Sequence, residues 1–187
     1  MSDLEARLAA ILAQAPRLMA VLQTARALDL PDWMVFSGAI YQPVWNHLTG
    51  RPLEHGLKDY DLAYFDAADL SWDAEDLVIR RAAQAFGPPF GDLVEVRNQA
   101  RVHLWFEDHF GEAYAPLGSS AEALERFVAP AFAVGVRLLE DDRFCIFAPY
   151  GLEDLFAMRL KPARPSLAYA EIAASIRERW PEIAVES

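Results

Sequence analysis

The chain has 187 residues, of which 53% are hydrophobic and 24% are charged. This length and apolar content predict one compact domain with a substantial core, and they exclude extensive disorder. Lysine and arginine number 17 against 28 aspartates and glutamates, so the formal net charge is −11. A protein of that charge repels polyanions, which disfavours broad contact with nucleic acid or with an anionic membrane.

Cysteine occurs once, at Cys145, so no disulfide within the chain and no cysteine-based zinc site can form. The first residues lack the basic segment of a secretory signal. No stretch reaches the roughly 18 apolar residues that a membrane span requires. The sequence therefore predicts a cytoplasmic protein that does not associate with a membrane.

Two amphipathic helices are predicted at the start of the chain. Ser2 and Glu5 have the spacing of a capping box, in which each side chain accepts a hydrogen bond from a backbone N–H group of the first turn. This helix ends before Pro16, because proline interrupts helical hydrogen bonding. Apolar residues then recur at helical spacing over 18–28, which predicts a second helix with one packed face.

A strand, a tight turn and a helix are predicted next. Residues 33–36 form a short apolar run, Ser37-Gly38 interrupts it, and residues 39–48 are compatible with a helix. Residues 51–56 are predicted to form a loop.

The middle of the chain predicts a helix followed by a long strand. Ser71 is a suitable N-cap for the helix, and Gly87 marks its end. From 93 to 106 the even positions are apolar and most odd positions are polar. Because strands usually have five or six residues, we expect a bend or bulge near Asn98, the one polar residue at an even position.

The rest of the chain predicts a short helix, a β-hairpin and two C-terminal helices. Their ranges are 119–130 for the short helix, 133–139 and 144–147 for the hairpin, and 151–160 and 166–180 for the last helices. The fold class expected is α+β, with a mixed sheet flanked by helices. We expect a single domain over 1–187, with a core of about 32–162 and helical extensions over 2–30 and 164–180.

Two aspartates stand out in the segment 58–65, which has the alternation of a strand. Asp59 and Asp61 are expected on one face, where like charges repel unless a cation neutralises them. Magnesium takes oxygen ligands, usually one or two carboxylates with substrate phosphates, and Glu95 on another predicted strand is a candidate third ligand. The alternative is that the two aspartates are solvated on an edge strand, where charges prevent aggregation.

Four segments together resemble a bacterial nucleotidyltransferase-like family without an established substrate: 37–50, 58–66, 96–105 and 148–156. That family belongs to the superfamily of DNA polymerase beta, tRNA CCA-adding enzymes and antibiotic nucleotidyltransferases. The superfamily signature is a small-residue turn, an Asp-x-Asp strand and a later strand carboxylate. The likeness covers roughly residues 34 to 162. The chain has Ser-Gly-Ala where Gly-Gly or Gly-Ser is usual, and a loop insertion lengthens the segment between the turn and the aspartates.

The resemblance implies transfer of a nucleoside monophosphate from a nucleoside triphosphate to a small-molecule or protein acceptor. Ser37 and Gly38 match the turn that approaches the phosphates. Asp59 and Asp61 match the metal-binding pair. Glu95 matches the third carboxylate, which helps to hold the catalytic metal or accepts the proton of the attacking hydroxyl. The metal implied is Mg²⁺, with Mn²⁺ as the alternative.

Lys58 and Arg101 are further candidates for contact with the nucleotide. Arg101 shares the odd positions of the predicted strand with Glu95, and a guanidinium suits phosphate. The alternative for Arg101 is an ion pair on a solvated face. Lys58 either contacts phosphate or keeps its charge in water at the entrance of the strand. Asn98 is expected to brace the backbone beside the site through hydrogen bonds.

Three other functions remain open at this point. The chain is alternatively a non-catalytic nucleotide-binding or regulatory module, the nucleotidyltransferase partner of a toxin–antitoxin pair, or an enzyme that tails RNA. Retention of all three carboxylates favours an enzyme. The net charge of −11 disfavours a nucleic-acid acceptor.

Overall fold

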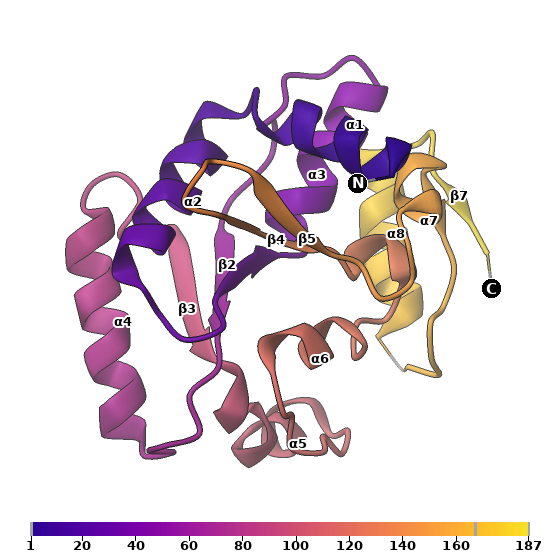
Figure 1. The fold of residues 1–187 in the computed structure, drawn as a ribbon. Coiled ribbons are helices and arrows are strands. Elements are labelled where there is room, and N and C mark those ends of the chain that lie inside the picture. The colour runs from indigo at the N-terminus through magenta and orange to yellow at the C-terminus, as the bar shows by residue number, and fades with distance from the viewer. Residues whose placement is uncertain (1, 167, 187) are drawn as a thin grey trace.

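The computed structural model describes residues 2–166 and 168–186 and has the predicted α+β architecture (Figure 1). Five strands form a mixed sheet in the order β3-β2-β1-β4-β5, and only the β2–β3 pair is parallel. The strands are β1 Met34–Phe36, β2 Tyr60–Tyr64, β3 Val94–Asn98, β4 Gly135–Leu138 and β5 Phe144–Phe147. A second, two-stranded parallel sheet pairs β6 Arg159–Leu160 with β7 Ala184–Val185.

Helices flank the five-stranded sheet. The α-helices are α1 Asp3–Leu12, α2 Pro16–Leu28, α3 Gly38–Leu48, α4 Trp72–Phe86, α5 Phe106–Phe110, α6 Ser120–Leu124, α7 Glu153–Phe156 and α8 Tyr169–Arg179. Two 3₁₀-helices, η1 Gln99–Leu104 and η2 Pro130–Phe132, lie between them in the chain. Figure 1 shows α2 and α4 on one side of the strands, α7 and α8 on the other, and α5 and α6 below them.

Local sequence signals set the start of several helices, as predicted. Ser2 and Glu5 form both hydrogen bonds of the capping box at α1. The Ser71 hydroxyl accepts a hydrogen bond from the N–H of Ala74 at 3.2 Å, and α4 ends at Gly87 with a positive φ of 54°. Such caps satisfy backbone groups that the helix itself leaves without a partner.

The main core lies between one face of the large sheet and the helices α1 to α4, and it continues to α7 and α8. Alternate strand residues supply it, among them Val35, Leu62 and Val96, and each is at most 3% exposed. A smaller apolar cluster on the opposite face contains Met34 and Leu124. The sheet is therefore covered on both faces, but unequally.

Among the described residues, no single helix is long and apolar enough to cross a membrane. Helices α1 and α2 satisfy the length and composition criteria only as a pair, and that pair is bent by 99°.

The predicted strand over 93–106 is wrong beyond Asn98, where the chain turns into η1. The Asn98 side-chain oxygen accepts hydrogen bonds from the N–H groups of Ala100 and Asp66 at 3.1 and 3.0 Å, and its amide donates to the Asp66 carbonyl at 2.8 Å. These bonds cap the 3₁₀-helix and replace a strand ladder. The alternation of apolar and polar residues beyond Asn98 is thus not that of a strand.

The predicted C-terminal helix over 151–160 is also wrong in extent. Helix α7 covers only 153–156, and residues 159–160 form β6. The Asp154 carboxylate accepts a hydrogen bond from Arg159 Nε at 2.6 Å, and Met158 has a positive φ of 48° that ends the helical path.

Two other helices are shorter than expected. The helix predicted over 119–130 ends at Leu124, and the one predicted over 166–180 forms α8 from Tyr169 to Arg179. Leu167, which that prediction includes, lies outside the described residues, as do Met1 and Ser187.

Candidate active site

A row of side chains across three strands forms the centre of the site. Asp61 of β2 lies directly opposite Glu95 of β3 and opposite Phe36 of β1. Because side chains alternate along a strand, residues in one row of a sheet share a face. Asp61 and Glu95 therefore lie on the face opposite the main core, while Leu62 points into the core. Asp59 precedes β2 and is exposed to solvent.

The electrostatic state of Asp61 reflects its crowded surroundings. Burial, reinforced by the negative charges of Asp59 and Glu95, raises the pKa of Asp61 from 3.8 to about 7, and Arg97 opposes this rise. The three carboxylates are thus near enough to influence one another. A bound cation would relieve the repulsion, which is typical of a site built for a positively charged group.

The fit of a divalent metal to these residues is partial. Glu95 forms an ion pair with Arg97 at 2.5 Å, and both side chains are nearly half exposed. Among the described residues, no three Asp, Glu, His or Cys side chains form a group arranged to hold a metal. Magnesium, however, usually takes only one or two protein carboxylates and completes its shell with water and substrate phosphates. The donor chemistry of Asp59 and Asp61 fits that requirement.

The turn between β1 and α3 presents the start of a helix beside this row. Ser37 has φ 58° and ψ −121°, a conformation rare for a residue with a side chain, and its N–H donates to the Val134 carbonyl at 3.0 Å. Within the described part of the chain, the N–H groups of Gly38 and Ala39 have no hydrogen-bond acceptor. Free N–H groups and the positive end of the helix dipole favour an anion here.

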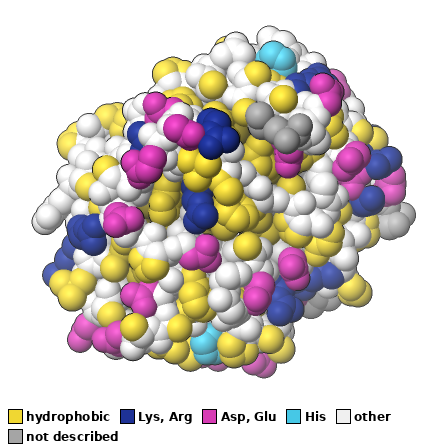
Figure 2. Space-filling view, viewed as in Figure 1, with side chains coloured by type: hydrophobic (Ala, Val, Ile, Leu, Met, Phe, Trp, Pro, Cys, Tyr) yellow, Lys and Arg dark blue, Asp and Glu magenta, His cyan; other side chains and the backbone are white. Residues whose placement is uncertain are grey.

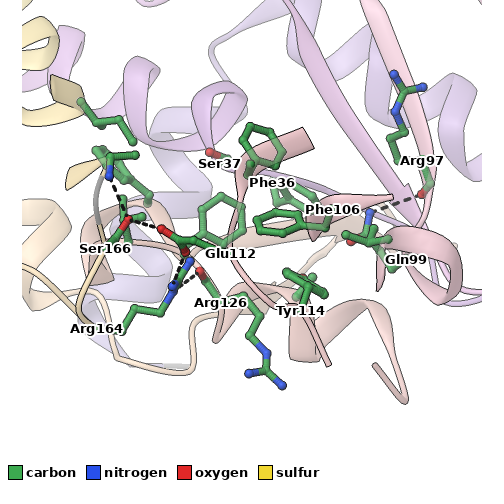
Figure 3. A pocket seen from close by; sticks show the side chains of 18 of the residues that line it. Phe36, Ser37, Arg97, Gln99, Phe106, Glu112, Tyr114, Arg126, Arg164 and Ser166 are labelled. Carbon is green, nitrogen blue, oxygen red and sulfur yellow. Dashed lines mark hydrogen bonds and ion pairs between the residues drawn. The ribbon is translucent and has the colours of Figure 1, made fainter. Parts of the chain in front are cut away.

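Two cavities meet near the site. The larger, of about 510 Å³, is lined at one end by Phe36 and Ser37 and extends to Gln99, which follows β3. Figure 3 shows Phe36, Ser37, Phe106 and Tyr114 among the side chains that surround it. Most of its wall is aromatic and aliphatic.

The smaller cavity, of about 340 Å³, is lined by Glu95 together with Trp72 and His109. Arg97, Trp105 and Phe110 line both cavities. The smaller cavity therefore reaches the carboxylate row at Glu95, and the larger one reaches Phe36, the strand neighbour of Asp61.

Comparison with known proteins identifies the family. A family model described as nucleotidyltransferase matches residues 23–185. The chain belongs to a nucleotidyltransferase family. One solved structure, an NMR structure described as revealing a CCA-adding enzyme head domain, is similar with a TM-score of 0.71 and 25% identity, over 90% of this chain and 88% of that one. No curated protein matches the chain.

These comparisons confirm the resemblance stated from the sequence, the fold class and the assignment as a transferase. The family implies a nucleoside triphosphate substrate. This fold places Phe36, Asp61 and Glu95 in adjacent positions of one sheet face, and the Ser37 turn directly follows Phe36.

The other two sequence candidates lie apart from this row or at its margin. Arg101 is buried in η1, where its guanidinium forms an ion pair with the Glu75 carboxylate and its Nε donates to the Leu70 carbonyl at 2.8 Å. Glu75 also accepts a hydrogen bond from the N–H of Asn98 at 2.8 Å. The structure thus joins Arg101 to α4 and not to the carboxylate row. Lys58 is exposed just before β2.

The nucleotidyltransferase has two further residues at the site that the sequence analysis missed. Arg179, at the end of α8, donates through Nη2 to Gln42 Oε1 at 2.6 Å and to the Gly56 carbonyl at 2.9 Å. The same Gln42 amide lies 2.9 Å from where a Cβ on Gly38 would be, so one side chain separates the guanidinium from the start of α3. No local pattern pointed to Arg179, because 137 positions separate it from Gln42.

Tyr41 is the second such residue, and it lines the larger cavity. Burial raises the pKa of Tyr41 to about 12, while Arg179 lowers it and Asp61 and Asp59 raise it. The hydroxyl therefore lies within the electrostatic influence of both the cation and the carboxylates. Tyr41 lies in a helix next to apolar residues, as a core aromatic does, so the sequence contained no indication that it lies near the carboxylates.

Proposed function

We propose that the protein transfers a nucleoside monophosphate from a nucleoside triphosphate to a small-molecule or protein acceptor, in a reaction that depends on a divalent metal. The observation that carries the proposal is the row of Glu95, Asp61 and Phe36 beside the start of α3. This row lies on the sheet face opposite the main core, which we call the open face. Membership of a nucleotidyltransferase family supports the class of reaction.

In this proposal the start of α3 holds the triphosphate. The N–H groups of Gly38 and Ala39 donate to phosphate oxygens, and the turn at Ser37 fixes the orientation of these N–H groups. Arg179 adds a positive charge from the opposite side of Gln42. Together these groups orient the bond between the α- and β-phosphates for attack.

Asp59 and Asp61 would hold Mg²⁺ or Mn²⁺, with Glu95 as a third carboxylate. The metal, when bound, neutralises charge on the phosphates and on the leaving pyrophosphate. The raised pKa of Asp61 supports this role, because the ionised form of a crowded carboxylate is favoured once a cation is present.

The chemical step is an in-line displacement. A hydroxyl oxygen of the acceptor forms a bond to the α-phosphorus, the bond from that phosphorus to the bridging oxygen breaks, and pyrophosphate leaves with its electron pair. Glu95 accepts the hydroxyl proton. Its position at the smaller cavity supports this role, because an acceptor in that cavity would contact Glu95 directly.

The smaller cavity suits a small acceptor or a single side chain of a protein. Its volume of about 340 Å³ is near the lower limit of ligand pockets, and Trp72 and Trp105 offer aromatic surface for a ring. On the face in Figure 2, basic and acidic side chains are mixed and surround a central hydrophobic area. That mixture offers no broad basic patch on this face for a nucleic-acid backbone.

The test uses the variants Asp59→Asn and Asp61→Asn, with Asp73→Asn in α4 as a control of equal charge change. Each protein is incubated with Mg²⁺ and each labelled nucleoside triphosphate, alone and with a metabolite extract, and the products are analysed by mass. We expect the two site variants to lose at least about 100-fold in transfer, in line with loss of an electrostatic group at a reacting centre. Unchanged binding and transfer in both site variants would contradict the proposal.

A further inference from the structure

The larger cavity indicates which class of nucleotide the protein binds. We propose that this cavity, which we name the aromatic cavity, binds the base and ribose of a purine nucleoside triphosphate. The inference rests on the proposed function, since it assumes that the triphosphate lies at the start of α3. It adds the class of base and the residues that select it.

The position of the aromatic cavity relative to the site supports this assignment. Phe36 and Ser37 line it, and Phe36 is the strand neighbour of Asp61. A nucleotide with its phosphates at Ser37 and Asp61 can extend its nucleoside directly into this space. Arg97 of β3 and Gln99, the first residue of η1, also line it.

The interior of the aromatic cavity suits a flat ring. The ring of Phe106 lies 4.4 Å from that of Tyr114 and 4.7 Å from that of Phe110, with interplanar angles of 40° and 44°. Trp105 packs 6.1 Å from Phe106. Stacking of a nucleobase on such rings contributes about 1–3 kcal/mol per base. Figure 3 shows Phe106 and Tyr114 near one another in the wall of this cavity.

Polar groups lie at two ends of the apolar interior. At one end Arg164 forms an ion pair with Glu112 at 3.0 Å and donates to the Arg126 carbonyl at 2.9 Å, and Ser166 contacts Glu112 at 3.4 Å. At the other end the Gln99 side chain is 5% exposed and donates to a backbone carbonyl only at the long distance of 3.4 Å. A base with a flat apolar face and polar edges matches this distribution.

The charge of the lining also matches a nucleotide. Arg97, Arg126 and Arg164 line the aromatic cavity together with Glu112, so the formal charge of its lining is +2, whereas the whole chain has −11. The smaller cavity has two glutamates, Glu75 and Glu95, against Arg97. The positive lining therefore favours a ligand whose anionic phosphates lie next to the aromatic cavity over one whose phosphates lie next to the smaller cavity.

The volume favours a purine over a pyrimidine. About 510 Å³ lies within the range of pockets for drug-sized ligands. A two-ring base covers more of the aromatic wall than a one-ring base and so removes more apolar surface from water. We expect ATP and GTP to bind about tenfold more tightly than CTP and UTP.

The experiment measures binding by titration calorimetry in the presence of Mg²⁺. The ligands are ATP, GTP, CTP and UTP, together with inorganic tripolyphosphate, which has the phosphates but no nucleoside. The proteins are the wild type, Tyr114→Ala, Tyr114→Phe and, as a matched control outside both cavities, Tyr150→Ala. Thermal unfolding of each variant shows whether it is folded.

We expect Tyr114→Ala to weaken ATP binding about tenfold and to leave tripolyphosphate binding unchanged. Tyr114→Phe retains the ring and should bind ATP as the wild type does, and so should Tyr150→Ala. If Tyr114→Ala does not fold, the wild type alone decides, because ATP must bind more tightly than both CTP and tripolyphosphate.

The inference is overturned if the wild type binds pyrimidine nucleotides as tightly as purine nucleotides, or if folded Tyr114→Ala binds ATP normally. A wild type that binds tripolyphosphate and all four nucleotides equally would overturn the inference and leave the proposed function intact. A wild type that binds neither tripolyphosphate nor any nucleotide with Mg²⁺ would overturn both.

Discussion

The two faces of the large sheet are built from the same strands but differ in composition and cover. One face presents Leu62, Val96 and Val35 to a closed apolar core under α1 to α4. The opposite face carries Asp61 and Glu95, and beside them the two cavities open. Neighbouring residues of β2 thus lie in the core or on the opposite face, because successive side chains of a strand point to opposite faces.

The two faces therefore make different contributions: one stabilises the fold, and the other carries the groups proposed to bind the metal and the nucleotide. Apolar burial on the closed face contributes folding free energy, whereas the crowded carboxylates on the open face oppose folding in the absence of a cation. Substitutions of adjacent residues should therefore have distinct effects.

The closed face should govern stability without governing binding. Leu62→Ala removes a side chain that is 1% exposed, and we expect a loss of about 3–4 kcal/mol in the free energy of unfolding, from lost burial and a residual cavity. Urea denaturation measures the loss. The folded variant should bind Mg²⁺–ATP within about twofold of the wild type. A large loss of binding with normal stability would remove the distinction between the faces.

The buried pair of Arg101 and Glu75 should belong to the structural side of the comparison, although Arg101 was a candidate for phosphate binding. Arg101→Met leaves the Glu75 carboxylate buried without its cation, and we expect a loss of about 3 kcal/mol. Arg80→Met, which breaks an exposed pair with Asp76 on the same helix, should cost less than about 1 kcal/mol. If Arg101→Met instead keeps its stability and loses nucleotide affinity, Arg101 binds phosphate as first expected.

The open face should respond to pH. The pKa of Asp61 is about 7 in the folded protein against 3.8 for an ordinary aspartate. Between these values the folded state holds more protons than the unfolded state, so the contribution of Asp61 to the free energy of unfolding falls as pH rises and is level above about pH 7.

Asp61→Asn should remove this decrease in the free energy of unfolding with rising pH. We expect the variant to gain on the order of 2 kcal/mol over the wild type at pH 8 without divalent metal, and little at pH 4. Urea unfolding in a chelating buffer measures the difference, and Asp73→Asn is the control. Because a bound cation neutralises the repulsion between the ionised Asp61 and its neighbours, Mg²⁺ should stabilise the wild type at pH 8 and not the variant. Equal pH profiles for wild type and Asp61→Asn would contradict the assignment.

The smallest expected effect concerns the margin of the open face. Arg179→Gln removes the positive charge beside Gln42, and we expect about tenfold weaker binding of Mg²⁺–ATP, roughly 1.4 kcal/mol. Arg177→Gln, on the same helix, changes the charge equally and should bind ATP as the wild type does. Equal affinities for the two variants would place Arg179 outside the phosphate site.

Elements with local signals were predictable from the sequence. Ser2, Glu5 and Ser71 act within one helical turn, and their caps are where the sequence predicts them. The hairpin of β4 and β5 also follows from two adjacent apolar runs. In each case the interacting groups are close in the chain, so their chemistry is sufficient to predict the element.

Elements that depend on distant partners were not predictable in this way. Strand β6 exists because Arg159 and Leu160 pair with Ala184 and Val185, about two dozen positions later. The end of β3 depends on bonds from Asn98 to Asp66 and Glu75. A helical or alternating pattern of residues contains no information about partners that are distant in the sequence.

The Asp-x-Asp segment and the small-residue turn before α3 were enough, as sequence motifs, to indicate the nucleotidyltransferase family that the comparison confirms. Only the tertiary structure brought Arg101 to Glu75 of α4, Arg179 to Gln42 of α3, and Glu95 to the wall of a cavity. The physical reason is that a motif lies within a few residues of one element, whereas a cavity is formed where side chains from several elements converge. Their convergence depends on the packing of the whole chain.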